Sequence, residues 1–214
     1  MDNKSLKTIR NYVEFNAITS PNSSFIICPH TNNKISNKRL KDNLDKINFY
    51  LTNNYKLKKG SKICTLIENS LSSIQLMMGI MYSGMIHVPL NLVAGEEQLS
   101  YIVKHSNLKI IFSSSQNINL AKKIIQKFSS EVIIVEIDKD NFVDTIDDNF
   151  KILEDSTEQK NNALLMYTSG TTGKPKGVML SHENILHGGK NVEISHELES
   201  QDRALCVLPL YHIN

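Results

Sequence analysis

The sequence predicts an α/β fold in which a mostly parallel sheet is flanked by helices. Short apolar runs alternate with longer amphipathic stretches over residues 1–137, which is the pattern of strands and crossover helices. A further apolar run precedes residues 167–177, which are rich in glycine, hydroxyl residues and lysine. The chain has 214 residues, of which 40% are hydrophobic, and this length can bury a core in one or two domains.

Amphipathic periodicity predicts the helices in order along the chain. The first two cover residues 6–18 and 37–53, where apolar residues recur at three- and four-residue spacing. Their predicted core positions are Leu6, Ile9, Val13 and Ala17 in the first, and Leu40, Leu44, Ile47 and Leu51 in the second. Three further helices are predicted over residues 71–82, 97–105 and 120–128.

Short apolar runs between these helices predict the strands. Helices that alternate with strands imply right-handed crossovers, and therefore a sheet that is mostly parallel. The predicted strands are residues 24–28, 63–67, 86–90, 109–112, 132–135, 163–166 and 178–180.

An acidic and polar stretch, residues 138–162, interrupts the alternation. We predict that it is a surface connection with a short helical part within residues 142–153. It divides the chain into an N-terminal α/β subdomain, residues 1–137, and the start of a phosphate-loop subdomain, residues 163–214, which is truncated.

The run from Tyr167 to Gly177 has the composition of a phosphate-binding loop. Its glycines allow the backbone to turn tightly and expose N–H donors, while its hydroxyls and lysines add further donors and positive charge. It is not a Walker loop, because the second glycine comes three residues after Gly170 and Lys174 is followed by Pro175. The candidate ATP-phosphate ligands are Thr168, Ser169, Gly170, Thr171, Thr172, Gly173 and Lys176.

The complete loop, followed by Ser181-His182-Glu183-Asn184, resembles the phosphate loop of the adenylate-forming superfamily. That superfamily contains acyl-CoA synthetases, peptide-synthetase adenylation domains and firefly-type luciferases. Residues 68–70 and 78–91 are similar to the family's early helix and its "G-x-x-x-V-P-L-N" segment. The resemblance implies ATP-dependent activation of a carboxylic acid to an acyl-adenylate. Thioester formation with CoA or with a carrier-protein phosphopantetheine thiol would follow, and Mg²⁺ would share the phosphate charge.

The segment Leu208-Pro209-Leu210-Tyr211-His212 resembles the family's "P-L-F-H-x-x-G" segment, which places an aromatic residue and a histidine beside the acid pocket. His212 is therefore the candidate catalytic residue on the substrate side. Amino-acid-activating domains usually carry a Phe-Asp pair there, so the resemblance favours a fatty or other organic acid.

Three segments of the family are absent from this sequence: the adenine- and magnesium-binding Tyr-Gly-x-Thr-Glu, the ribose-binding Thr-Gly-Asp, and the domain with the catalytic lysine. We therefore expect an incomplete N-terminal part of the large domain of an acyl-CoA synthetase-like enzyme, inactive by itself. One alternative is a truncated, catalytically inactive relative that acts as a nucleotide-binding or interaction module. The other is an unrelated ATP-hydrolysing module, against which Pro175 counts.

Composition excludes several classes of protein. A net charge of +2 is nearly neutral, and the basic run at residues 56–62 is too short for a nucleic-acid surface. No stretch reaches eighteen apolar residues and the N-terminus lacks a signal-peptide core, so we expect a cytoplasmic location without a transmembrane segment. Cys28, Cys64 and Cys206 occur singly in apolar, strand-like runs, and we expect buried, reduced thiols and no metal site.

Ser181 is predicted to cap a helix, with Glu183 in its positive first turn. His182 and His187 are then expected at solvent-facing positions of that helix.

Overall fold

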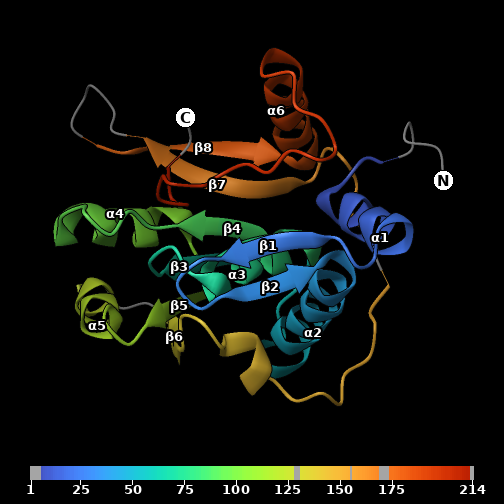
Figure 1. Cartoon of the computed structure of the whole chain (residues 1–214). Helices are drawn as coiled ribbons and strands as arrows, with labels where there is room; N and C mark the ends of the chain where they lie inside the picture. Colours follow the sequence, from blue (N-terminus) through green and yellow to red (C-terminus); the bar gives the residue numbers. More distant parts are fainter. Residues whose placement is uncertain (1–5, 128–130, 155, 169–173, 213–214) are drawn as a thin grey trace.

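The computed structural model describes residues 6–127, 131–154, 156–168 and 174–212. Its centre is a sheet with the strand order β6-β5-β3-β4-β7-β8 (Figure 1). Neighbouring strands from β6 to β7 are parallel, and β8 is antiparallel to β7, which confirms the predicted α/β fold. The strands are β3 (Lys62–Leu66), β4 (Ile86–Pro89), β5 (Ile110–Ser114), β6 (Ile133–Ile137), β7 (Asn162–Thr168) and β8 (Lys176–Ser181).

Helices cover both faces of the sheet. Ile63 and Ile110 belong to one buried cluster with residues of α1, α2 and α3, whereas their neighbours Cys64 and Ile111 belong to a second cluster with α4 and α5. Adjacent residues of one strand thus point to opposite, covered faces, as in parallel sheets generally. The helices are α1 (Ile9–Thr19), α2 (Asn37–Tyr55), α3 (Leu71–Tyr82), α4 (Glu96–Ser106), α5 (Ile118–Gln126) and α6 (His182–Ser195). Figure 1 shows α6 projecting from the β7-β8 end of the sheet.

The predicted core positions of α2 are confirmed, since Leu40, Leu44, Ile47 and Leu51 are all buried. Of the positions predicted for the first helix, Leu6 precedes α1 and is buried, Ile9 and Val13 of α1 are buried, and Ala17 is partly exposed. None of the helices in the described ranges is long and apolar enough to cross a membrane.

A buried carboxylate joins the first three helices. Asp45 of α2 accepts hydrogen bonds from the Tyr82 hydroxyl (2.8 Å) and from the Lys41 ammonium (2.6 Å). The Arg10 guanidinium of α1 lies 4.5 Å from the centre of the Tyr82 ring. A buried charge is tolerated when it is paired and hydrogen-bonded in this way, so α1, α2 and α3 form one packed unit.

Two predicted elements differ from the structure. The strand at residues 24–28 is confirmed as β1 (Ser24–Cys28), but it pairs with β2 (Asn33–Ser36) in a separate antiparallel sheet. Strand β2 is not predicted from the sequence, because its four residues contain one apolar side chain, Ile35. The helical part expected within residues 142–153 is limited to one 3₁₀ turn, η2 (Phe142–Thr145).

The predicted subdomain boundaries stay a prediction. Residues 138–154 are mostly exposed, although Phe142, Val143 and Ile146 are buried. Both β7 and β8 belong to the same sheet as β3 to β6.

Ser70 fixes the start of α3 through a reciprocal cap. Its side chain accepts a hydrogen bond from the Ser73 backbone N–H (3.3 Å), and the Ser73 hydroxyl accepts one from the Ser70 N–H (2.9 Å). Ser70→Ala is therefore expected to lower the free energy of unfolding by about 1 kcal/mol in urea titrations. Ser115→Ala, at an exposed turn residue, is the control. Equal losses in the two variants would contradict the capping role.

Candidate functional site

A pocket lies at the carboxyl ends of β4 and β7, which are adjacent parallel strands. From β4 the chain continues through α4 to β5, and from β7 it continues to β8 on the other side, so the two connections leave in opposite directions. Ligands of open α/β sheets bind where connections diverge in this way. The pocket has a volume of about 240 Å³ and is lined by Pro89, Asn91, Gln98, Ile102, Met166, Tyr167, Thr168, Tyr211 and His212.

Local geometry places the wall formed by β4 and α4. Pro89 ends β4, and the Asn91 side chain accepts a hydrogen bond from the Val93 N–H (3.0 Å), which turns the chain toward α4. Gln98 and Ile102 are four residues apart on α4 and therefore lie on the same helix face. None of these four lining residues is a site residue predicted from the sequence. The V-P-L-N segment at the end of a predicted strand was the signal available for Pro89 and Asn91, and nothing comparable marked Gln98 or Ile102.

Tyr167 is held in the opposite wall. Its hydroxyl lies 2.8 Å from Nδ1 of His105, whose ring stacks on Tyr101 with 5.4 Å between ring centres. Burial, together with the neighbouring Tyr101, raises the pKa of Tyr167 to about 12. Tyr167 is therefore a neutral phenol at physiological pH, and its contact with His105 fixes the ring at the side of the pocket.

The structure brings two predicted phosphate ligands to the two ends of the loop. Thr168 is the last residue of β7 and Lys176 is the first residue of β8, and they are partners in the strand register. Both residues are exposed. Their hydroxyl and ammonium groups therefore belong to the same end of the sheet, where an anionic ligand could contact them. The other predicted ligands, Ser169, Gly170, Thr171, Thr172 and Gly173, lie outside the described residues.

Gly177 has a role different from the expected turn. It lies within β8, where an added Cβ would come within 3.1 Å of Leu165 Cδ1 and 3.4 Å of the Tyr167 ring. The small residue therefore lets the β7 side chains pack against β8.

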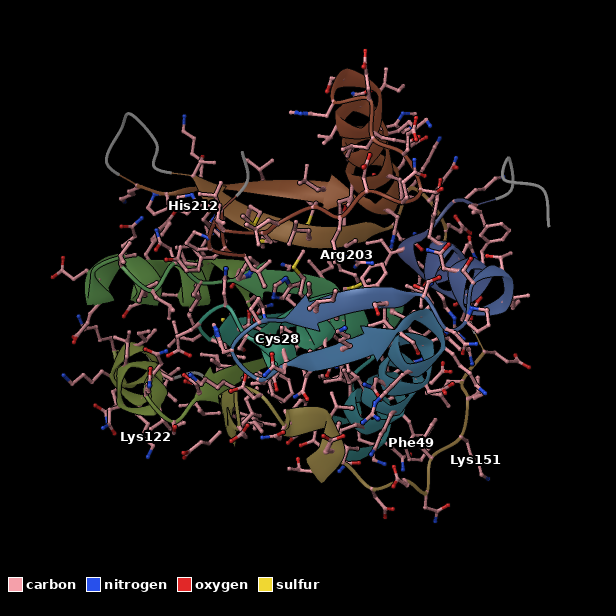
Figure 2. The ribbon with its side chains drawn as sticks, in the orientation of Figure 1. Cys28, Phe49, Lys122, Lys151, Arg203 and His212 are labelled. Carbon is pink, nitrogen blue, oxygen red and sulfur yellow. The ribbon has the colours of Figure 1, made fainter. Side chains whose placement is uncertain are left out.

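The predicted substrate-side residue, His212, lines the same pocket as Thr168. Its N–H donates to the Pro209 carbonyl (2.9 Å), and its ring centre lies 5.4 Å from that of Tyr211. Figure 2 shows His212 near the carboxyl end of β7, on the side of the molecule where α4 lies. Segments that are 44 residues apart in sequence thus meet at one pocket.

Two expectations about single residues are wrong. His182 does not face solvent: it is fully buried, and its Nδ1 accepts a hydrogen bond from the Ile9 N–H (3.3 Å), which ties the start of α6 to α1. Cys206 is exposed and lies in a segment without strand structure. Cys28 and Cys64 are buried as predicted, and burial raises the pKa of the Cys64 thiol.

The remaining predictions for the start of α6 are confirmed. Ser181 caps the helix by accepting from the Asn184 N–H (3.1 Å), Glu183 lies in the first turn, and His187 is exposed. In the part of the chain that the structure describes, no group of three or more histidine, cysteine, aspartate or glutamate side chains is arranged to hold a metal ion.

A sequence model described as "AMP-binding enzyme" matches residues 13–214. The chain belongs to the AMP-binding enzyme family. Among curated relatives, it is 32% identical over 161 residues to sulfoacetate–CoA ligase of Cupriavidus necator, and 30% identical over 166 residues to malonate–CoA ligase of Arabidopsis thaliana. These alignments cover 74% and 73% of this chain, but 32% and 26% of the relatives.

Solved structures of other proteins share the fold. The N-terminal domain of FACL13 from Mycobacterium tuberculosis matches with a TM-score of 0.84 and 23% identity, covering 97% of this chain and 52% of that one. ATP-bound MatB from Rhodopseudomonas palustris matches with a TM-score of 0.80 and 20% identity. The match covers 96% of this chain and 41% of the MatB chain. The chain therefore spans about a third of the first curated relative and about half of the FACL13 domain.

Proposed function

We propose that this chain provides the phosphate-binding side and one wall of the acid pocket in an AMP-forming acid–CoA ligase. The carrying observation is that Thr168, a predicted phosphate ligand, lines the same pocket as Tyr211 and His212. Membership of the AMP-binding enzyme family supports the reaction class. It also counts against an unrelated ATP-hydrolysing module.

In the proposed reaction, a substrate carboxylate attacks the α-phosphorus of ATP and pyrophosphate leaves. Negative charge then accumulates on the departing phosphates. The Lys176 ammonium and the Thr168 hydroxyl, with the N–H groups of the loop between them, would stabilise that charge and hold the leaving group in line. His212 and Tyr211 would contact the acid from the other end of the pocket.

Mg²⁺ is the ion that the family resemblance implies for the phosphates. The described residues offer no cluster of carboxylates for it, and no described carboxylate lines the pocket. The described residues therefore do not form a magnesium site of their own.

We propose an organic acid as substrate and CoA as the acceptor, in the cytoplasm. Relatives named for sulfoacetate, oxalate and malonate act on small acids with a second acidic group, and others are named for feruloyl-CoA formation. Fatty acids and a carrier-protein thiol are the alternatives that an assay must separate. The activity is proposed for the native gene product, and the 214-residue chain alone is expected to be inactive.

The test is AMP formation by the native gene product with ATP, Mg²⁺ and CoA. Sulfoacetate, malonate, oxalate, ferulate and palmitate are supplied one at a time, and AMP is measured by chromatography. We expect AMP with one class of acid and none without acid. Lys176→Gln should lower kcat/KM by about 30-fold, the effect of one charge-assisted contact of about 2 kcal/mol. Lys122→Gln, at an exposed position of α5, is the control.

Other outcomes would overturn the proposal in different ways. ATP binding without AMP formation for any acid would indicate the catalytically inactive relative. Steady phosphate release without acid would indicate an ATP-hydrolysing module. Exchange of pyrophosphate into ATP by the isolated 214-residue chain, dependent on acid, would contradict its expected inactivity.

A further inference from the structure

We propose that Asn69 is the positioning residue that holds Tyr211 and His212 at the acid pocket. The side-chain amide of Asn69 makes two hydrogen bonds to a segment about 140 residues further along the chain. Its Nδ2 donates to the Leu208 carbonyl (2.8 Å), and its Oδ1 accepts from the Leu210 N–H (2.9 Å). The assignment of an acid pocket rests on the proposed function, whereas the tether itself does not.

The two hydrogen bonds engage the backbone carbonyl of Leu208 and the backbone N–H of Leu210, immediately before Tyr211 and His212. A side-chain amide carries both N–H donors and an acceptor oxygen, so it can satisfy a carbonyl and an N–H two residues apart. A carboxylate in the same place could accept but not donate, and an aliphatic side chain could do neither. Asparagine therefore fixes both the position and the register of this segment.

Little else in the described structure holds this segment by hydrogen bonds. The other hydrogen bonds of residues 199–212 that the structure describes join members of that segment to one another, as in His212 N–H to Pro209 and Cys206 Sγ to Leu208. Leu205 and Val207 are 78% and 73% exposed, so packing contributes little at those positions. Leu210 and Cys206 line a small pocket together with Ile26 and Leu71.

Both sequence neighbours of Asn69 are anchored by hydrogen bonds. Glu68, two residues after the end of β3, accepts hydrogen bonds from the Ser114 hydroxyl (3.1 Å) and from the Asn117 amide (2.8 Å). Ser70, on the other side, caps α3. Asn69 therefore lies between two anchored neighbours at the carboxyl end of the sheet, and its side chain presents a fixed docking point for residues 208–210.

Loss of the tether should affect the two ends of the pocket differently. Tyr211 and His212 follow the tethered residues directly, whereas Thr168 and Lys176 are placed by the β7-β8 register. Removing the amide should therefore raise KM for the acid and leave KM for ATP unchanged. A substitution that only destabilised the fold would not separate the two constants in this way.

The first experiment measures amide hydrogen exchange of Leu210. In Asn69→Leu, which loses both bonds, we expect exchange about 30-fold faster, corresponding to two ordinary hydrogen bonds. In Asn69→Asp the carboxylate still accepts from the Leu210 N–H, so the increase should be smaller. Asn53→Leu, at an exposed position of α2, should leave the rate unchanged. Unchanged exchange in Asn69→Leu would overturn the tether, provided that circular dichroism shows a folded protein.

The second experiment measures KM for acid and for ATP with the native gene product. We expect KM for the acid to rise about tenfold in Asn69→Leu and less in Asn69→Asp, with KM for ATP within about twofold of wild type. Faster exchange of the Leu210 amide without a change in KM for the acid would show that Asn69 holds the segment but does not affect acid binding. That result would overturn the positioning role. A wild-type protein that forms no AMP with any acid would overturn the proposed function. The Leu210 exchange rates would still decide whether the tether exists.

Discussion

Gly79→Val is expected to lower the free energy of unfolding by about 3 kcal/mol, because it inserts a side chain where α3 packs directly against Ile47 of α2. A Cβ at position 79 would lie 2.7 Å from Cγ2 and 3.0 Å from Cδ1 of Ile47. Ile47 lies on α2 and is fully buried, so the surrounding close-packed core resists its displacement. The bulkier residue must therefore push α2 and α3 apart. For a chain of this size, the melting temperature should fall by about 6–12 °C in calorimetry.

Gly188→Val is the matched control. Gly188 is also a helical glycine, in α6, but a Cβ there meets no atom within 4 Å. Its replacement should change the free energy of unfolding by well under about 1 kcal/mol, because valine has a somewhat better helix propensity than glycine. Equal destabilisation by the two variants would refute the close approach of α2 and α3.

Residues whose environment is set by their own helix or strand could be predicted from the sequence. Leu40, Leu44, Ile47 and Leu51 are buried because their spacing places them on one face of α2, whichever element covers that face. The same logic places Thr168 at the end of a strand that leads into a glycine-rich loop. The periodicity of apolar residues and the residue types typical of turns carry this information, and both are local features of the sequence.

Residues whose environment depends on distant partners could not be predicted. His182 is buried because α1, 173 residues away, offers it the Ile9 N–H. The strand order is also non-local, since β5 lies on the opposite side of β3 from β4, and β7 returns to the far side of β4. This return is what creates the pocket between β4 and β7. Sequence periodicity therefore predicts the strands, but not which of their ends meet.

The same dependence applies to Asn69. Its sequence neighbourhood, Glu68-Asn69-Ser70, indicates a strand-to-helix turn and the start of α3. Nothing local indicates that its amide contacts Leu208 and Leu210. These contacts connect Asn69, in the N-terminal half of the sequence, to the residues immediately before Tyr211 and His212 of the pocket.

His87 should make the protein sensitive to mild acid. It lies in β4 with 2% of its surface exposed, and its Nε2 is 2.8 Å from the Thr65 hydroxyl. Within the described residues, its Nδ1 has no hydrogen-bond partner. Burial lowers the pKa of His87 from 6.5 to about 3, because the apolar surroundings disfavour the charged imidazolium.

The sign of the effect follows from where the proton binds. Above the unfolded pKa of 6.5, His87 is neutral in the folded and unfolded states and contributes no pH dependence. As the pH falls from there toward the folded pKa of about 3, the unfolded chain takes up a proton that the folded protein excludes. The free energy of unfolding should therefore fall by about 1.4 kcal/mol per pH unit, or about 3 kcal/mol by pH 4.5.

His87→Gln removes the titrating ring and keeps a polar side chain beside Thr65. Between about pH 7 and pH 4.5, wild type should lose about 3 kcal/mol more than this variant in urea unfolding experiments. Other groups, such as Asp138, whose pKa is lowered by hydrogen bonds from the Asp140 and Asn141 N–H groups, titrate in both proteins and cancel in the difference. His30→Gln, at an exposed position, should keep the wild-type pH dependence. Equal loss of stability in wild type and His87→Gln would show that His87 takes up a proton as readily in the folded protein as in the unfolded chain. That result would contradict a buried, apolar environment for the His87 ring.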